Sequence, residues 1–273
     1  MRYLFLLLFT INLFSYDRVV ALSPAINEII YALDDGKKIV GNTTFCNYPK
    51  DAKQKPKVGG YFTPSLEKII SLKPDIVIMQ SSSVKLAQKL NKLGITTKIV
   101  KLNKLNDIKN TIRDIGNILD KNKQAKIILG NLESKLLNTK NIIKNKKILI
   151  VIGHNLKLDK RIFVAGKNLY FDDIINFSGN TNAFQNKKVG QPILNMENII
   201  ALNPDIVILL APYMQQKGLK KNDLINPWLS LPIHASQTKA IYVLSEDYAG
   251  ISSHRLSLFL DDFKEYLLDA KTR

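Results

Sequence analysis

Two stretches of the chain share one pattern of apolar and polar positions. Residues 65–79 read SLEKIISLKPDIVIM and residues 195–209 read NMENIIALNPDIVIL, and the glutamates Glu67 and Glu197 are 130 positions apart (197 − 67). In each copy a short amphipathic segment leads to Pro-Asp, where proline cannot continue a helix. The β-branched run that follows is typical of a buried parallel strand. Solenoid repeats recur every ~20–50 residues, so this longer period predicts two lobes built on one plan. Chance recurrence of a common α/β connection is the alternative.

The rest of the hydrophobic pattern also alternates between strands and helices. It predicts strands over residues 19–22, 38–41, 97–102, 147–153 and 240–244, and helices that begin at Pro24 or cover residues 84–93, 169–177 and 257–268. Strands that alternate with helices in this way indicate parallel sheets with helices on both faces. The expected fold class is therefore α/β, with two Rossmann-like lobes.

The middle of the chain, from about residue 106 to 145, has no strand pattern. Apolar residues recur at helical spacing, first over residues 108–119 and then from Ala125 to Ile143. The second set covers about five turns, or roughly 28 Å, and predicts one long backbone helix that joins the lobes. An ordinary pair of packed helices is the alternative. The expected domains are an N-terminal lobe at 17–105, a helical connector at 106–146 and a C-terminal lobe at 147–273.

The N-terminus differs from the rest of the chain. Met1-Arg2 is followed by a nearly continuous apolar run over residues 3–14 and by the small residue Ser15. This pattern is typical of a secretory signal peptide and is too short for a membrane span; an uncleaved anchor or a buried strand is the alternative. We expect residues 1–16 to be removed and the mature chain to be periplasmic. The single cysteine, Cys46, allows no intrachain disulfide.

The formal net charge is +17, from 40 Lys and Arg against 23 Asp and Glu. The lysines are spread along the chain without an arginine-aromatic motif, which indicates a solvated surface rather than a nucleic-acid interface. We therefore expect no nucleic acid as a partner. A cationic surface that helps to capture anionic chelates is the alternative.

Candidate binding residues follow from the predicted strands. In doubly wound sheets, ligands bind beyond the carboxyl ends of the strands. The loops at these ends, together with the segment before the first repeat copy, contain aromatic, hydroxyl and amide side chains that suit a bulky, flat, partly polar ligand. Alternatively, each aromatic covers the core of its own lobe. The candidates are Tyr61, Phe62, Gln80, His154, Tyr213, Asp247 and Tyr248.

Catalytic patterns are absent from the sequence. The three histidines, His154, His234 and His254, lack the spacing of a zinc site. Neither a G-x-S-x-G elbow nor a phosphate-binding glycine loop occurs. The sequence therefore predicts a protein that is not an enzyme, holds no cofactor and forms no metal-binding site from its own side chains.

Several motifs resemble one known family. They are RVVALSPAINEIIYAL at 18–33, GNTTFCNYP at 41–49, VGGYFTPSLEKIISLKPDIVI at 58–78 and FVAGKNLYFDDIINFSGNTNAF at 163–184. With the signal peptide and the second repeat copy, they resemble the periplasmic metal-chelate-binding proteins. These proteins are the substrate-binding components of ABC importers for cobalamin, ferric siderophores and haem. The resemblance spans nearly all of residues 18–268.

The resemblance implies two α/β lobes joined by one long helix, with a small-molecule metal chelate held between them and little hinge closure. It also implies that Glu67 and Glu197 each present a carboxylate to arginines of the permease, so that the partners are the permease and, through it, the ATPase. Alternatively, each glutamate complements the dipole of the helix in whose first turn it lies. We expect the binding protein to be a monomer.

The resemblance also ranks the ligands. Tyr61 falls where cobalamin binders of the family place an aromatic residue, and Tyr48 matches a cleft tyrosine. Asp247 and Tyr248 lie in SEDYAGISSHR, which is similar to the final cleft loop of the family. Cobalamin or a related corrinoid is the first expectation.

Three positions depart from the cobalamin pattern, which has tryptophan where this chain has Tyr61 and Pro192, and arginine where it has Ile251. Haem, whose iron a cleft tyrosine could ligate, and a ferric siderophore therefore remain alternatives. A chelatase-like enzyme is a further alternative, which would place histidine and carboxylate together in the cleft.

Overall fold

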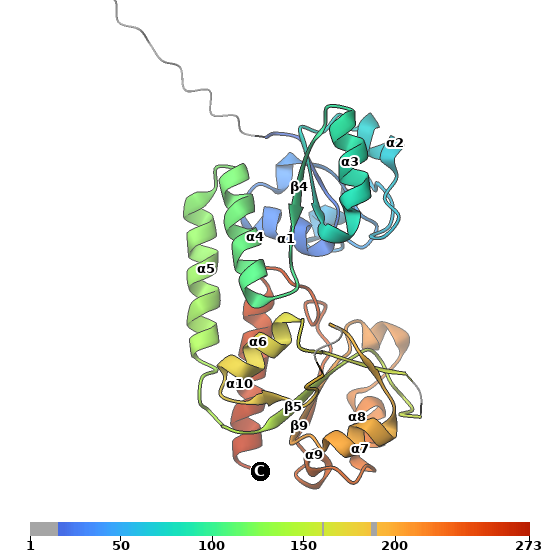
Figure 1. Ribbon diagram of the computed structural model, residues 1–273, viewed down its shortest axis with the longest axis vertical. Coiled ribbons are helices and arrows are strands. Elements are labelled where there is room, and N and C mark those ends of the chain that lie inside the picture. Colours follow the sequence, from blue (N-terminus) through green and yellow to red (C-terminus); the bar gives the residue numbers. More distant parts are fainter. Residues whose placement is uncertain (1–15, 160, 187–189) are drawn as a thin grey trace, which may run out of the picture.

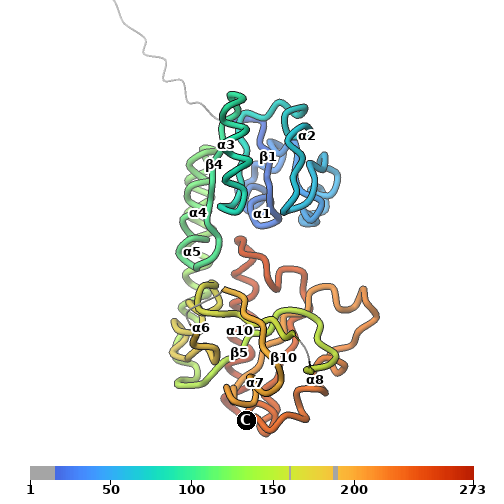
Figure 2. Tube along the Cα trace, turned by 45° about the vertical axis from the view of Figure 1, so that its right-hand side comes forward, coloured from blue at the N-terminus to red at the C-terminus, as the bar shows by residue number. Residues whose placement is uncertain are grey.

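The fold is that of a computed structural model, which describes residues 16–159, 161–186 and 190–273. The signal peptide expected at residues 1–16 lies, except for Tyr16, outside these residues. Two α/β lobes lie one above the other, and a pair of helices runs along one side of both (Figures 1 and 2). No helix among the described residues is long and apolar enough to cross a membrane.

The N-lobe is built on a four-stranded parallel sheet in the order β2-β1-β3-β4. The strands consist mainly of β-branched residues, and the side chains of the central strands β1 and β3 are buried on both faces, apart from the last residue of β3. The strands are β1 (Val19–Ala21), β2 (Ile39–Asn42), β3 (Ile76–Gln80) and β4 (Thr96–Val100), and the helices are α1 (Pro24–Ala32), α2 (Leu66–Ser71) and α3 (Val84–Lys92), with short 3₁₀ turns at Gly36–Lys38, Lys50–Gln54 and Ser81–Ser83.

The C-lobe contains a six-stranded sheet in the order β10-β9-β5-β6-β8, and β7 also pairs with β5. Strands β5, β7, β9 and β10 are parallel, whereas β6 and β8 are antiparallel to their neighbours. Only residues 153–161 connect β5 to β6, and a parallel crossover needs roughly a dozen residues or more. The parallel arrangement expected for this lobe is therefore limited to four of its six strands.

The elements of the C-lobe, in chain order, are β5 (Lys147–Ile152), β6 (Ile162–Val164), α6 (Tyr170–Phe177), β7 (Thr181–Asn182), β8 (Ile193–Leu194), α7 (Met196–Leu202), β9 (Ile206–Leu210), a 3₁₀ turn (Met214–Lys217), α8 (Lys221–Leu229), α9 (His234–Gln237), β10 (Ile241–Leu244) and α10 (Leu256–Lys271).

The two repeat copies form the same unit in both lobes, a short helix followed by a central strand: α2 and β3 in the N-lobe, α7 and β9 in the C-lobe. Each helix begins at a side-chain cap, because Ser65 Oγ accepts a hydrogen bond from the amide of Lys68 and Asn195 Oδ1 accepts one from the amide of Asn198. Each strand pairs with the first strand of its lobe. Glu67 and Glu197 lie exposed in the first turns of their helices.

The aspartate of each Pro-Asp also has the same role in both lobes. Asp75 Oδ2 accepts hydrogen bonds from the amides of Asp17 and Arg18 at 2.9 Å, just before β1. Asp205 Oδ2 accepts one from the amide of Lys147 at 2.7 Å, at the start of β5. The carboxylate therefore fixes the beginning of the neighbouring strand in each lobe.

Replacing either aspartate with alanine (Asp75→Ala or Asp205→Ala) is expected to lower the free energy of unfolding by about 1 kcal/mol, since hydrogen bonds to a partly exposed carboxylate are lost. Urea titration of both variants measures this loss. Glu265→Ala, at an exposed position of α10, is the control and should change the free energy by less. A loss in one lobe only would contradict the equivalence of the two aspartates.

The connector contains two helices, α4 (Leu105–Ile118) and α5 (Asn122–Leu137), which pack against each other. They lie side by side along one edge of the molecule (Figure 1). The second helix ends at Leu137, so its 16 residues span about 24 Å, and Ile143 lies beyond its end. The connector is therefore a helical hairpin, and its second helix is shorter than the sequence pattern predicts.

One hydrophobic core runs through both lobes. A single cluster of buried residues includes Ile26 of the N-lobe, Ile112 of α4, Leu132 of α5 and Phe259 of α10. Separate clusters fill the opposite faces of the two sheets. Because the connector helices share a core with both lobes, they act as packed structural elements and not as a flexible linker.

Candidate functional site

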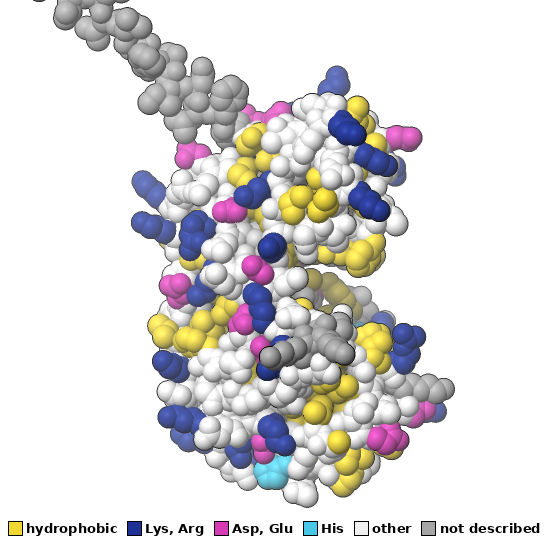
Figure 3. Space-filling view, in the orientation of Figure 1, with side chains coloured by type: hydrophobic (Ala, Val, Ile, Leu, Met, Phe, Trp, Pro, Cys, Tyr) yellow, Lys and Arg dark blue, Asp and Glu magenta, His cyan; other side chains and the backbone are white. Residues whose placement is uncertain are grey.

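A cavity of about 390 Å³ lies between the two lobes, where the carboxyl ends of strands from both sheets face each other. The space-filling view shows the molecule hollowed at this level (Figure 3). Gln80 ends β3, Ile152 ends β5 and Leu210 ends β9, and all three line the cavity. The other lining residues are Ser23, Pro24, Ala25, Tyr61, Leu102, Asn103, Leu169, Tyr170, Phe171, Gln191, Gly250, Ile251 and Ser252.

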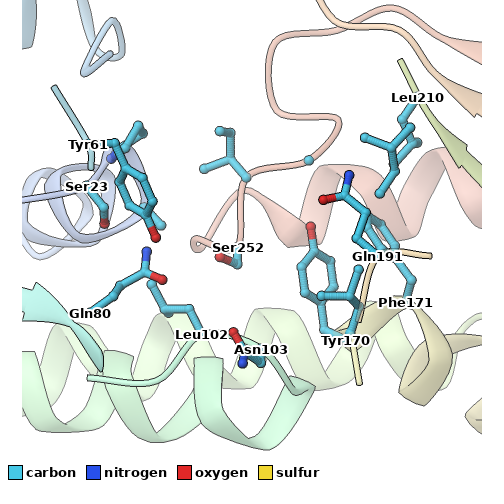
Figure 4. Close-up of a pocket in the computed structure, with 16 residues that line it drawn as sticks. Ser23, Tyr61, Gln80, Leu102, Asn103, Tyr170, Phe171, Gln191, Leu210 and Ser252 are labelled. Carbon is cyan, nitrogen blue, oxygen red and sulfur yellow. The ribbon is translucent and has the colours of Figure 1, made fainter. Parts of the chain in front are cut away.

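Two tyrosines enter this cavity from opposite lobes. Tyr61 and Tyr170 lie on opposite sides of it, and their hydroxyl groups point inward (Figure 4). Tyr170 is the first residue of α6 and is only 5% exposed. Burial raises its pKa, so the phenol stays protonated and can donate a hydrogen bond to a ligand.

The polar side chains of the described residues around the cavity are neutral. None of the described residues that line it carries a formal charge, and its polar side chains are hydroxyls and primary amides, including Gln80, Asn103 and Gln191. This contrasts with the net charge of +17. Lysines and arginines are instead scattered over the surface of both lobes (Figure 3). Such a lining favours ligands that exchange hydrogen bonds rather than ions.

A buried ion pair crosses between the lobes. Glu28 on α1 is 3% exposed and Arg255, just before α10, is 5% exposed. The Nη2 and Nε atoms of Arg255 donate to the two oxygens of Glu28 at 2.7 and 3.1 Å. Ser253 Oγ donates to Glu28 Oε2 at 2.6 Å. Both carboxylate oxygens therefore have partners, as a buried charge requires.

The same guanidinium group contacts Tyr48 and Asp247, two of the residues expected to bind the ligand. Its Nη1 donates to Asp247 Oδ1 at 2.5 Å, and its Cζ lies 3.8 Å from the centre of the Tyr48 ring. Burial lowers the pKa of Arg255, but the contacts with Glu28 and Asp247 outweigh this effect and raise it overall. Arg255 therefore stays charged.

His254, next to this ion pair, predicts a pH dependence of stability. Burial and the charge of Arg255 lower the pKa of His254 to about 4, below its value of 6.5 in an unfolded chain. The unfolded state therefore binds a proton first as the pH falls, and up to about 3 kcal/mol of stability is lost between pH 6.5 and 4. Urea unfolding of the wild type at pH 7 and at pH 4.5 measures this loss.

The matched variant for this pH dependence is His254→Asn, which cannot titrate. Its free energy of unfolding should fall less than that of the wild type between the two pH values. Equal falls in both proteins would contradict a depressed pKa at His254.

Of the residues expected to bind ligand, Tyr61 and Gln80 line the cavity. Phe62 packs edge-on against Tyr61, with ring centroids 4.5 Å apart, but it is 83% exposed and lines a separate surface depression with residues of α3. Tyr48 and Asp247 lie at the interface between the lobes, on Arg255.

The other three candidates lie away from this cavity's lining. His154 Nε2 lies 2.8 Å from the carbonyl oxygen of Pro212. Tyr213 lines a second, polar depression between the lobes, with Asp247 and Asn47. Tyr248 donates from its hydroxyl to Asp262 Oδ2 on α10 at 2.7 Å and packs against the shared core.

Sequence reasoning missed Tyr170, Asn103, Gln191 and the pair of Glu28 and Arg255. Tyr170 and Gln191 adjoin the antiparallel strands β6 and β8, so the rule based on parallel strand ends does not find them. Glu28 had a usable signal, because it is a charged residue in an otherwise mainly apolar helix whose residues 25–30 are all buried.

Two lobes of the same plan that face each other across a ligand-sized cavity define a bilobal binding protein. Among the described residues, no group of three or more His, Cys, Asp or Glu is placed to hold a metal ion. The family model for periplasmic binding proteins matches residues 19–248. The chain therefore belongs to the periplasmic binding protein family.

Individual relatives show the same class. The chain is 29% identical to the ABC transporter substrate-binding lipoprotein YvrC of Bacillus subtilis, covering 91% of this chain and 82% of the relative. It is 26% identical to the vitamin B12-binding protein of Vibrio vulnificus, covering 96% and 94%. The heme-binding protein RhuT of Roseiflexus sp. RS-1 superposes with a TM-score of 0.74 at 25% identity, covering 93% and 98%. All three are named as binding proteins and not as enzymes.

Proposed function

We propose that this protein is the periplasmic substrate-binding component of an ABC importer, and that it holds a metal chelate between its two lobes for delivery to the permease. The observation that carries the proposal is the cavity between the lobes, lined by strand ends and by one inward-facing tyrosine from each lobe. Membership of the family and the names of the relatives support it.

Within this class we propose cobalamin or a related corrinoid as the first ligand. The periphery of a corrinoid carries neutral amide groups, which can exchange hydrogen bonds with the hydroxyl and amide side chains of the cavity. Haem propionates and carboxylate-rich siderophores would instead favour cationic partners, and the described lining residues include none. Since a corrinoid is bulky, part of it extends beyond this cavity along the gap between the lobes.

Haem is the second candidate, and the position of Tyr61 favours it. Its hydroxyl faces the cavity (Figure 4), where a phenolate could ligate iron. If haem is the ligand, Tyr61→Phe should shift the visible spectrum of the haemin complex, whereas Phe62→Leu, a substitution at the exposed neighbour, should not. A chelatase-like enzyme is less well supported, because the described lining residues contain no pair of histidine and carboxylate.

The direct test is binding. Purified mature protein, residues 17–273, is mixed separately with cyanocobalamin, haemin and a ferric siderophore and then passed through a gel-filtration column. We expect cyanocobalamin to elute with the protein and its visible absorbance to shift. Retention of haemin alone would show that haem, and not cobalamin, is the ligand. Retention of none of the three would contradict the proposed function.

Replacing Tyr170 with phenylalanine is expected to weaken binding of the retained chelate about tenfold, because one hydrogen bond from a buried phenol is lost. Isothermal titration calorimetry measures the affinity. Tyr242→Phe is the matched control, since its hydroxyl donates to Asp269 on α10 and lies outside the cavity lining. An unchanged affinity in Tyr170→Phe would remove Tyr170 from the binding site.

A further inference from the structure

The loop between β10 and α10 reaches from the C-lobe towards α1 of the N-lobe (Figure 2). It carries Arg255, whose contacts with Glu28 bury two opposite charges at the interface between the lobes. Separating the lobes would break two charge-assisted hydrogen bonds from Arg255 to Glu28, which are stronger than neutral ones, so the contact resists separation of the two groups. The ion pair is thus suited to hold the lobes at a fixed distance.

Arg255 also contacts one side chain of each lobe at the interface, Tyr48 and Asp247. Tyr48 belongs to the N-lobe, and its carbonyl oxygen accepts a hydrogen bond from Asn27 Nδ2 at 3.0 Å. Its ring lies under the guanidinium group. Asp247 belongs to the C-lobe and contacts the remaining Nη1. A single planar group therefore orients one side chain from each lobe.

We infer that Arg255 is a positioning residue, which clamps the two lobes through Glu28 and pre-orients Tyr48 and Asp247 before a ligand arrives. The pre-orientation of Tyr48 and Asp247 for binding rests on the proposed function, whereas the clamp itself does not. A protein held in its binding geometry loses less conformational freedom on binding. Lysine cannot replace this arginine, because it lacks the planar fork that reaches Glu28 and Asp247 together.

The clamp is tested without any ligand. Spin labels are attached to cysteines introduced at the exposed residues Lys85 on α3 and Lys221 on α8, one in each lobe. The native Cys46 is buried and burial raises the pKa of its thiol, so it should not react in the folded protein. Pulsed dipolar spectroscopy then measures the distribution of distances between the lobes.

A narrow distribution is expected for the parent protein, and a broader or longer one for Arg255→Lys and Glu28→Gln. Arg273→Lys is the matched control, because Arg273 pairs with Asp269 within the C-lobe and does not cross to the N-lobe. Circular dichroism checks that each variant is folded. Narrow, unshifted distributions in folded Arg255→Lys and Glu28→Gln would overturn the clamp.

The pre-orientation is tested with cyanocobalamin, haemin or the ferric siderophore, whichever the parent protein retains. Arg255→Lys should release it about tenfold faster in stopped-flow measurements, since loss of pre-organisation in a binding site acts mainly on dissociation. Unchanged dissociation would overturn the positioning role. If the parent retains none of the three probes, the proposed function fails, while the distance distributions still decide whether the clamp exists.

Discussion

Replacing both Glu67 and Glu197 with lysine is expected to abolish import of the chelate while leaving its binding unchanged. The two carboxylates occupy equivalent, exposed positions in the first turns of α2 and α7. Neither lines the cavity between the lobes. If each lobe docks on one permease subunit through its glutamate, charge reversal turns two attractions into repulsions. Uptake of labelled chelate by cells that carry the variant as their sole binding protein measures the effect.

The control for this experiment is a second pair of charge reversals, Glu133→Lys with Glu265→Lys. These glutamates are exposed on α5 and α10. Reversing them changes the net charge by the same amount as the Glu67 and Glu197 substitutions do. This variant should support uptake as the parent does. Binding of the chelate by the docking variant, measured by calorimetry, should match the parent. Normal uptake by the docking variant would refute the docking role, and a loss of binding would show that the glutamates act on the site.

The fold could be predicted where the local residue pattern alone determines which element forms and where it lies. Pro-Asp followed by a β-branched run specifies where a helix stops and a buried strand starts, and both copies form central strands. The length of the second connector helix was overestimated, because apolar spacing continues to Ile143 although the helix ends at Leu137. Asn141 and Asn145 adopt left-handed backbone conformations, which asparagine tolerates better than most residues. A helix therefore cannot continue through Asn141 to Ile143.

The site was predictable only in part, for a physical reason. Gln80 follows from the rule that ligands lie beyond the ends of parallel strands, and it lines the cavity. Tyr170 enters from the start of a helix that follows the antiparallel strand β6, where this rule gives no expectation. Glu28 and Arg255 are 227 positions apart, so no local pattern contains their pairing. Tyr248 follows a parallel strand, yet its hydroxyl contacts α10.

The second large effect concerns the stability of the whole chain. Arg255→Met is expected to lower the free energy of unfolding by about 3–5 kcal/mol, because Glu28 is then left buried without a counter-charge. A loss of this size is a large fraction of the roughly 5–15 kcal/mol that stabilises a typical protein. Urea unfolding at pH 7, followed by circular dichroism, measures it. The cation–π contact with Tyr48 is lost in the same variant.

A double variant separates the cost of an unpaired charge from the net contribution of the pair. Arg255→Met with Glu28→Leu removes both charges and fills most of the space with apolar atoms, so it should recover a large part of the stability lost in Arg255→Met. Ser253 and Asp247 then lose one partner each, so recovery should be incomplete. If the double variant were as unstable as the sum of the two single variants, the buried charge would not be the cause. A stable double variant whose lobes are no longer held at one distance would show that the pair serves geometry more than stability.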